Sequence, residues 1–579
     1  MSDRGTSAFV GIAFDAVDVD PDARRRRICS TNIQKTGGRA QMATRRGTKN
    51  AVESLDSTSS GSPLTQARLN ELMDASDPAN IELVFGFVGP TGIDLNKVCD
   101  ALRSQLRAVQ YEVSEVRLSE KITTYLGKSG SFPNEYKRIK TLMDRGTGLR
   151  EESGQPDIVA RLGIAAVREA RQKQTNDALK PAPRRAYFVR SFKRPEEVEI
   201  FRQVYGKAFT LISVYASRSW RLQFLRKLLA PSLGPERAKA EEFATELIGR
   251  DYEEEERKLG QRVGKTFPLA DYFVTSESRP ELERQLKRLV QLTFGNPYIS
   301  PSRDEQAMFL AKASALRSLD LSRQVGAAVV SSEGEILSTG CNEVPRFGGG
   351  LYWSNDDGLM RDFERGSDSN VDIKREIVED AFNRMQRKPG LLAAVARRRP
   401  SSELAHDALF AEGAYLRDAQ LFDVIEFGRA VHAEMAAISQ AARSGVRLQD
   451  ARLFCTTFPC HICARHIVAA GISEVVFIEP YEKSRTAELY GDSISVEPAE
   501  PSPRRANFRA FVGVAPRRYM DFFESFGVRK TVDGKIKEVD ELLATPRIKR
   551  LVFTYTLAEA FVVDGTKPPP SPTRARSIK

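Results

Sequence analysis

The sequence predicts an α/β fold in two parts, and three observations support this prediction. An apolar strand at 81–88 runs through the loop Gly89-Pro90-Thr91-Gly92 into a helix whose apolar side chains recur at helical spacing. Further strands and helices alternate between 186 and 274, and again between 303 and 479. Alternation on this scale is typical of sheets that are covered by helices, so each part is expected to be an α/β domain.

The first part opens with a strand, a glycine loop and a helix, an arrangement that binds phosphate through backbone N–H groups. The phosphate-loop pattern G-x-x-x-x-G-K-[ST], counted from Gly89, requires Gly, Lys and Ser/Thr where this chain has Asp94, Leu95 and Asn96. Without the lysine, the β- and γ-phosphates lose their main cation, and Asp94 would repel them. Gly89 and Gly92 are therefore candidates for nucleotide binding, with a simple turn as the alternative. This part resembles a P-loop nucleotide-kinase fold that has lost kinase chemistry.

The other elements expected in the first part are strands at 186–190, 208–215 and 271–274 and a helix at 196–205. The polar loop 191–195 follows a strand, where α/β proteins form their ligand crevice. Arg250 and Asp251, followed by the acidic run 253–256, are expected on a solvated helix face.

The second part is expected to contain helices at 303–319, 432–444 and 461–470 and strands at 325–331, 335–341, 451–456 and 474–479. An insertion at 343–431 interrupts this order and should hold helices at 371–387 and 402–426.

Four residues of the second part form a candidate catalytic metal site. His432 and Glu434 lie in Val-His-Ala-Glu-Met, and Cys460 and Cys463 lie in Pro-Cys-His-Ile-Cys. One imidazole and two thiolates bind zinc and leave its fourth position open, which indicates a catalytic ion. A redox pair or a structural zinc site is the alternative, and Cys455 as a fourth ligand would close the site. The signature is typical of the zinc nucleobase deaminases.

This site predicts a hydrolytic chemistry. Zinc lowers the pKa of its water to about 7. Glu434 would take that proton, deliver it to N3 of a cytosine ring and help ammonia to leave, while hydroxide attacks C4. His461 and His466 are weaker candidate ligands, and nothing places His406 near the site.

Longer segments carry a family resemblance. Arg323-Gln324-Val325-Gly326-Ala327 and Ser338-Thr339-Gly340-Cys341-Asn342-Glu343-Val344-Pro345, together with the two metal motifs, resemble the deoxycytidylate deaminase family. With the first part included, residues from about 79 to about 530 resemble the two-domain anti-phage dCTP deaminases of bacteria, most strongly over 296–500. The resemblance implies a three-layer α/β/α sandwich of the cytidine-deaminase type.

The resemblance also implies roles for further residues. Asn342 would contact the substrate sugar, although Cys341 replaces the usual tyrosine; the alternative is a turn before Pro345. The segment 479–484 matches another family motif and could help to close the substrate pocket. A homo-oligomer is expected, and regulation by an RNA or a nucleotide effector through the first part is a possibility that the resemblance suggests.

The predicted organisation has four segments. They are a disordered basic arm at 1–78, a degenerate P-loop kinase-like domain at 79–295, a deaminase domain at 296–530 with its insertion at 343–431, and a C-terminal extension with a basic, Pro-rich tail at 531–579.

The net charge of +11 is concentrated in the two tails. Residues 1–50 hold ten Lys/Arg and five Asp, and residues 566–579 hold four Lys/Arg and no acid, which leaves about +2 for the remainder. The arm could touch nucleic acid or only be solvated, and disorder is favoured. The sequence has six cysteines and neither a membrane span nor a secretion signal, so a cytoplasmic protein with free thiols at Cys29, Cys99 and Cys341 is expected.

The predicted function is deamination of dCTP, dCMP or both to deoxyuridine nucleotides by a zinc hydrolase, with depletion of dCTP in anti-phage defence as the role implied by the resemblance. The alternatives are a cytosine or adenine deaminase of RNA or single-stranded DNA, and a housekeeping dCMP deaminase. A nucleic-acid deaminase should show a basic groove with stacking aromatic residues beside its pocket.

Overall fold

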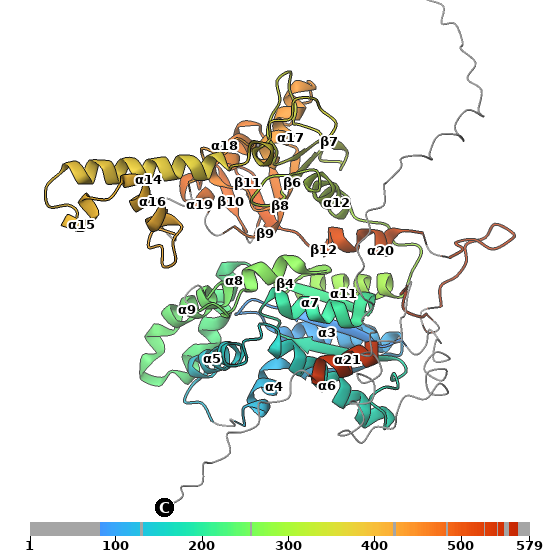
Figure 1. Cartoon of the computed structure of the whole chain (residues 1–579). Coiled ribbons are helices and arrows are strands. Elements are labelled where there is room, and N and C mark those ends of the chain that lie inside the picture. The colour runs from blue at the N-terminus through green and yellow to red at the C-terminus, as the bar shows by residue number, and fades with distance from the viewer. Residues whose placement is uncertain are drawn as a thin grey trace, which may run out of the picture. The chain divides into compact units, whose positions relative to one another are not determined.

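The computed structural model describes residues 81–564, apart from 128–130, 255–256, 418, 421–423, 482–483, 499, 526, 541, 543 and 549–554 (Figure 1). The predicted basic arm and the basic tail after 564 lie outside the described residues. No helix in the described part of the chain is both long and apolar enough to cross a membrane.

The first sheet has the strand order β12-β5-β4-β1-β3-β2. Its strands are β1 (Leu83–Val88), β2 (Glu112–Arg117), β3 (Arg185–Arg190), β4 (Phe209–Tyr215), β5 (Tyr272–Thr275) and β12 (Gly513–Val514). The first five strands run parallel, whereas β12 pairs antiparallel with β5. Only β2 and β12 were not expected from the sequence, because β2 is a half-exposed polar strand and β12 has two residues.

Successive side chains of β1 point to opposite faces of the sheet, and all of them are buried. Both faces are therefore covered by helices. Phe85 and Phe87 face a core that α3 (Leu95–Ala108) and α11 (Arg279–Thr293) complete. Val84 and Val88 face the other core, which belongs to α4 (Leu118–Tyr125), α6 (Ile158–Thr175) and α7 (Pro195–Tyr205). A smaller core joins α5 (Glu135–Ser153), α8 (Arg218–Leu229) and α9 (Ala240–Tyr252).

The second sheet has the order β10-β11-β9-β8-β6-β7. Its strands are β6 (Gly326–Val330), β7 (Ile336–Cys341), β8 (Arg452–Thr457), β9 (Glu474–Glu479), β10 (Ile494–Val496) and β11 (Ala506–Ala510). One face packs against α12 (Arg303–Ala315) and the other against α17 (Ala433–Arg443) and α18 (His461–Ala469). These layers form the three-layer α/β/α arrangement that was expected for the second part.

The insertion contains α13 (Asp362–Arg365), α14 (Ser369–Arg387), α15 (Ala394–Arg397) and α16 (Ser401–Leu409). Helices α14 and α16 pack side by side through Phe382 and Leu404 (Figure 1). The expected helix at 402–426 was wrong in its length, since α16 ends at Leu409. Phe410 leaves the helical conformation and Gly413 adopts a positive φ of 78° soon after, a conformation that stops a helix.

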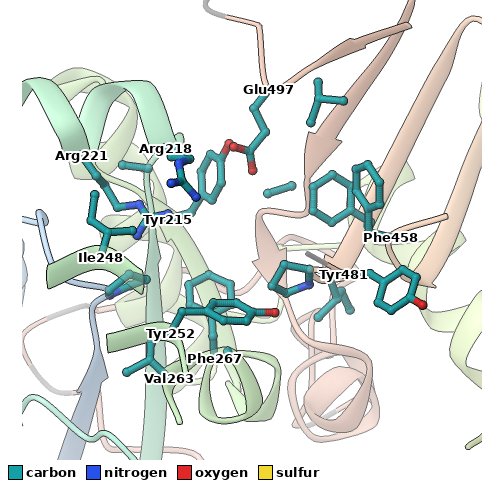
Figure 2. Close-up of a pocket in the computed structure, with 18 of the residues that line it drawn as sticks. Tyr215, Arg218, Arg221, Ile248, Tyr252, Val263, Phe267, Phe458, Tyr481 and Glu497 are labelled. Atoms are coloured by element: carbon teal, nitrogen blue, oxygen red, sulfur yellow. The ribbon is translucent and has the colours of Figure 1, made fainter. Parts of the chain in front are cut away.

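Both sheets belong to one compact unit of the described residues. Strand β12 joins the two parts, and Val514 of this strand donates its backbone N–H to Glu305 of α12 over 2.8 Å. Tyr215 at the end of β4 lies beside Glu497 in Figure 2, and its hydroxyl donates a hydrogen bond to the Glu497 carboxylate. The predicted domain boundary at 295–296 falls between α11 and α12 and stays a prediction, because β12 crosses from the second part into the first sheet.

Candidate metal centre and its surroundings

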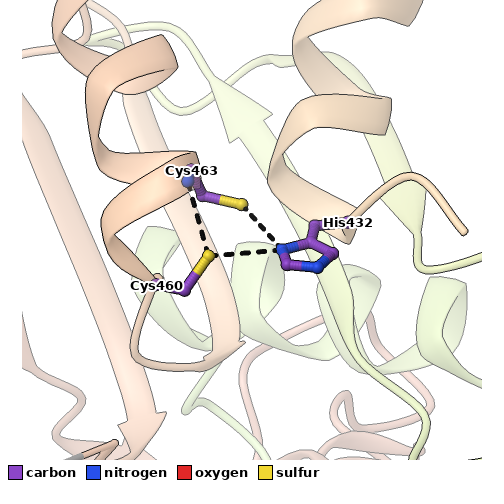
Figure 3. A group of neighbouring side chains, drawn as sticks. All are labelled: His432, Cys460 and Cys463. Atoms are coloured by element: carbon purple, nitrogen blue, oxygen red, sulfur yellow. Dashed lines mark hydrogen bonds between the residues drawn. The ribbon is translucent and has the colours of Figure 1, made fainter. Parts of the chain in front are cut away.

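Two helix N-termini carry the predicted metal ligands. His432 is the residue before α17, and Glu434 lies in the first turn of that helix. Cys460 is the residue before α18, which follows β8, and Cys463 lies in its first turn. Because residues three apart lie on the same face of a helix, both thiols point toward the same place (Figure 3).

The three ligand atoms have the spacing that zinc requires. His432 Nδ1 lies 3.3 Å from Cys460 Sγ and 3.3 Å from Cys463 Sγ. All three atoms lie within 4.8 Å of one another. Ligands about 2.0–2.3 Å from a tetrahedral ion are roughly 3.5 Å apart, so the group fits a zinc ion and leaves a fourth position open. Among the described residues, this is the one group of His, Cys, Asp or Glu side chains with such geometry.

The electrostatics of the group favour a thiolate. Hydrogen bonding from Cys463 and then from His432 lowers the pKa of the Cys460 thiol to about 4, against the opposing effect of burial. The hydrogen bond to Cys460 in turn raises the pKa of His432. A thiolate beside an imidazole is the pairing that binds a divalent, moderately soft metal.

Glu434 is a buried carboxyl beside the metal ligands. Glu434 is 4% exposed, and its Oε2 accepts a hydrogen bond from Cys463 Sγ over 3.4 Å. Burial raises its pKa above the ordinary value, and the charge of Cys460 adds to the shift. The carboxyl therefore holds a proton more readily than an exposed glutamate, which suits a group that passes protons to a substrate.

Gly340 of β7 allows α17 to approach close enough to place Glu434. A Cβ at Gly340 would lie 2.3 Å from the Ala433 carbonyl oxygen and 2.5 Å from the Ala437 backbone nitrogen. Any larger side chain would push the helix away from the sheet, so this glycine fixes the position of the first turn of α17.

A cavity of about 150 Å³ opens beside these residues. Its walls include Asp320, Arg323, Asn342, Ile425, His432, Glu434, Thr457, Phe458 and Tyr481. Ile425 comes from the insertion, and Tyr481 lies in the 479–484 segment that was expected to help close the pocket. Of these residues the sequence had singled out only His432, Glu434 and Asn342 as site residues. The sequence analysis did not identify Asp320, Thr457 and Phe458 as site residues, because no local sequence pattern marks them.

Asn342 lines the cavity, but its amide is engaged by the chain itself. Its Oδ1 accepts from the Val325 N–H and its Nδ2 donates to the Arg323 carbonyl, each over 2.7 Å. The side chain thus fixes the 323–325 segment, and its contact with a sugar stays a prediction. Arg323 is half exposed, pairs with Glu479 over 3.1 Å and lies 5.5 Å from the Tyr481 ring centroid.

The weaker candidate ligands lie outside the metal group. Cys455 is a fully buried residue of β8, so it packs in the core as expected rather than closing the site. His461 lies 4.0 Å from Glu426, and His406 lies on α16 beside Asp407. Cys99 and Cys341 are free thiols, as expected, whereas Cys29 lies outside the described residues.

In the first part, a carboxylate of the same chain accepts a hydrogen bond from the backbone of the glycine loop. Thr91 donates its backbone N–H to Asp251 Oδ2 over 2.6 Å, and Lys193 Nζ lies 2.7 Å from Asp251 Oδ1. Asp251 is 1% exposed, so its expected place on a solvated helix face was wrong. The reason is that this aspartate, at the end of α9, is held by the loop amide and the lysine.

The predicted phosphate-loop glycines frame this contact. Gly92 has a φ of 100°, and a Cβ on it would lie 2.8 Å from the Arg221 Cβ, so α8 packs directly on the loop. A Cβ on Gly89 would lie 2.8 Å from the Leu95 side chain. Lys193 belongs to the 191–195 loop, and its ammonium faces Asp251 rather than an open crevice.

Residues 301–479 match the model of the cytidine and deoxycytidylate deaminase zinc-binding region. The deoxycytidylate deaminase of Enterobacteria phage T2 is 40% identical over 55 residues, which are 10% of this chain and 29% of that protein. A probable deoxycytidylate deaminase of Drosophila melanogaster is 26% identical over 208 residues, 35% of this chain and 73% of that protein. The matched segment thus spans about three tenths of the phage relative.

A solved structure of the dCMP deaminase of cyanophage S-TIM5 with dCMP and dUMP is 18% identical and covers 37% of this chain and 100% of that one, but its TM-score of 0.21 is too low to carry an argument. The sequence matches support the deaminase family for residues 301–479. With the His432, Cys460 and Cys463 group, they identify zinc as the cofactor of this region.

Proposed function

We propose that this chain deaminates deoxycytidine nucleotides, dCTP, dCMP or both, to deoxyuridine nucleotides and ammonia. The observation that carries the proposal is the joint placement of a three-ligand zinc group and a buried Glu434 at the wall of one cavity, within the segment that matches the deaminase zinc-binding region. Catalytic zinc sites keep one position open in the same way.

The residues of this cavity have different roles in the proposed reaction. When bound by His432, Cys460 and Cys463, zinc would lower the pKa of its water so that hydroxide is available as the nucleophile at neutral pH. Glu434 carries a proton to the ring nitrogen N3 and then to the departing amine. The rings of Phe458 and Tyr481 form apolar walls against which a pyrimidine can pack. Overall, the oxygen of one water ends on C4 and the amine leaves as ammonia.

The size and charge of the cavity favour a free nucleotide over a nucleic-acid strand. At about 150 Å³ it is smaller than the usual pocket for a whole ligand, so it suits the base while sugar and phosphates stay near the mouth. Among its lining residues Arg323 is the one permanently cationic side chain, and Asp320 lies in the same wall. A strand-binding groove needs several cations and stacking platforms along its length.

We further propose that the biological role is depletion of dCTP during phage infection, and that the first part is a P-loop kinase-like domain without phosphoryl transfer. The resemblance of the chain to two-domain anti-phage dCTP deaminases supports the role. The missing loop lysine and the Asp251 carboxylate at the loop amide support the loss of kinase chemistry.

One assay tests the function. Purified protein is incubated with dCMP, dCTP, CTP, cytidine or single-stranded DNA, and cytosine and uracil products are separated by chromatography. We expect turnover of dCMP, dCTP or both. Conversion of cytosine in DNA alone would refute the proposal.

A matched variant separates chemistry from folding. Glu434→Gln keeps the shape of the side chain and removes its proton-carrying function, so we expect at least a hundredfold loss of turnover with one zinc per chain retained. Near-native rates in this variant would show that another group carries the proton.

A further inference from the structure

The last residues of the insertion pass over the mouth of the cavity of about 150 Å³ beside the metal ligands, which we call the deaminase cavity. We call residues 424–431, which end the insertion, the strap. Ile425 of the strap lines this cavity together with Glu434 and Thr457, which are only 4% and 5% exposed. Residues 426–428 of the strap are exposed. The strap therefore lies on the solvent side of the cavity, and Ile425 forms part of its mouth.

The first turn of α14 holds the strap on both sides of Ile425. Asn370 Nδ2 donates a hydrogen bond to the Val424 carbonyl over 3.1 Å. Ser369 Oγ donates a hydrogen bond to the Phe427 carbonyl, also over 3.1 Å. These two donors are the first two residues of the helix. Because one helix end fixes the backbone before and after Ile425, α14 determines where the Ile425 side chain lies.

Further contacts hold the rest of the strap. Arg429 pairs with Asp362 of α13, with 2.7 Å between the charged atoms. Val431 and Glu343 exchange two backbone hydrogen bonds, over 3.0 and 3.3 Å, in an isolated antiparallel bridge. The strap is thus fixed along its length, and its backbone occupies a set place at the mouth of the cavity.

The place of Ile425 suits contact with the part of a substrate that lies outside the base pocket. Since the cavity has room for a base and little more, the sugar of a bound nucleotide is expected at the mouth, near Ile425. Apolar surface that a ligand buries against such a side chain favours binding. A nucleic-acid strand, in contrast, continues in both directions from its cytosine and needs an open groove along its path. A fixed strap at the mouth obstructs such a groove, and obstruction of the wrong ligand is a source of specificity.

We propose that Ile425 is a specificity-determining residue of the deaminase cavity, which packs on a free deoxycytidine nucleotide and obstructs the path of a nucleic-acid strand. Asn370 is the positioning residue that holds Ile425 there through the Val424 carbonyl. This inference deepens the proposed function and rests on it. It gives the insertion a role in the choice of substrate class, because both the strap and α14 belong to the insertion.

The contact with a nucleotide is tested on the zinc-loaded full chain carrying Glu434→Gln, the parent, to which dCMP and dCTP bind without turnover and are titrated by calorimetry. Adding Ile425→Ala should weaken the tighter of the two nucleotides at least threefold, because apolar contact at the mouth is lost. Ile377→Ala makes the same change on an exposed residue of α14 that does not line the cavity, and it should leave the Kd unchanged. Equal Kd values for the parent and Ile425→Ala would overturn this inference alone. If the parent binds neither nucleotide, the proposed function itself fails and this inference fails with it.

The obstruction of a strand is tested with a short single-stranded DNA that has one central cytosine. Its Kd is measured by displacement of the bound nucleotide, so that binding elsewhere on the chain is not counted. In the parent and in Ile377→Ala we expect the DNA to bind at least tenfold more weakly than the nucleotide. In Ile425→Ala this ratio should fall at least threefold, because the smaller side chain leaves more room at the mouth. DNA that displaces the nucleotide from the parent with an equal Kd, or a ratio that Ile425→Ala leaves unchanged, would refute the obstructing role.

The positioning role of Asn370 is tested by a double-mutant cycle on nucleotide binding. Asn370→Ala removes the donor to Val424 and should weaken the nucleotide at least twofold. Because Asn370 acts through Ile425, the double variant Ile425→Ala, Asn370→Ala should bind the nucleotide no more weakly than Ile425→Ala alone. Asn370→Asp removes the same donor at nearly equal size and replaces Asn370→Ala in the cycle if the latter does not fold. Losses that multiply in the double variant, or an unchanged Kd in the Asn370 variant, would refute the positioning role.

Discussion

Asp251 and Lys193 form an ion pair against the glycine loop, and its energetic contribution can be predicted. Asp251 is 1% exposed and the side chain of Lys193 is 19% exposed, with 2.7 Å between their charged atoms. Asp251→Asn leaves Lys193 without its counter-charge and turns an amide N–H₂ toward either Lys193 or the Thr91 N–H. Breaking a fully buried pair costs about 3–5 kcal/mol, and the partial exposure of Lys193 lowers our expectation to about 2–3 kcal/mol.

The pair is tested by a double-mutant cycle in which stability is measured by urea unfolding of Asp251→Asn, Lys193→Met and the double variant. We expect the double variant to be at least about 1 kcal/mol more stable than the sum of the single losses predicts, because the two residues share one interaction. Additivity within about 0.5 kcal/mol would refute the pair as a stabilising unit. Pyrophosphate should stabilise Asp251→Asn more than the wild-type chain, since Lys193 then lacks its counter-charge and can attract an anion.

Further predictions concern the metal, the packing, the acid response and the loop. The double variant Cys460→Ser, Cys463→Ser should lose its zinc; elemental analysis showing one zinc per chain would contradict the ligand assignment. Gly340→Ala should cost about 1–3 kcal/mol of stability and lower turnover, because its Cβ would lie 2.3 Å from a carbonyl of α17; unchanged melting temperature and rate would refute the close approach. Burial raises the pKa of Asp304, but Arg509 and Arg452 outweigh it and hold this pKa below its ordinary value of 3.8. The stabilisation from this carboxylate is therefore complete above pH 3.8 and is lost as pH falls through the lower folded pKa, so Asp304→Asn should flatten the dependence of melting temperature on pH below 4. If the melting temperatures of Asp304→Asn and the wild-type chain fall equally with pH below 4, the predicted role of Asp304 is wrong. Finally, transfer of radiolabelled γ-phosphate from ATP to deoxynucleosides or their monophosphates should be undetectable, because Leu95 replaces the loop lysine; a labelled product would reverse that conclusion.

The metal group could be predicted from the sequence because its determinants are local. Each pair of residues lies within one helical turn, and each helix begins at a ligand, so the spacing in the chain fixes the spacing in space. Cys455 fits the same argument, since it lies on the apolar run of β8 and was expected to be a buried strand residue. The expected three-layer order of the second part followed from the alternation of helix and strand.

The features of the fold and the site that could not be predicted depend on contacts between residues that are distant in the sequence. Thr91 and Asp251 are 160 residues apart, and nothing near either position indicates that they meet. Asn342 lies in a recognisable motif. Whether its side-chain amide hydrogen-bonds the backbone or a sugar depends on where the 323–325 segment lies. The helix at 402–426 was overextended because the polar and apolar spacing continues past Leu409, although Gly413 interrupts the helix.

Strand β12 has a consequence for how the chain is made. During synthesis, β5 emerges long before Gly513 and Val514, and all strands of the second sheet from β6 to β11 are translated in between. Until then the outer edge of β5 has no partner, and open strand edges pair readily with other chains. Nascent or truncated products that end between residues 296 and 512 should therefore aggregate more than the finished protein. Strand β12, the last in chain order of the strands in the described residues, thus protects an edge of the first sheet.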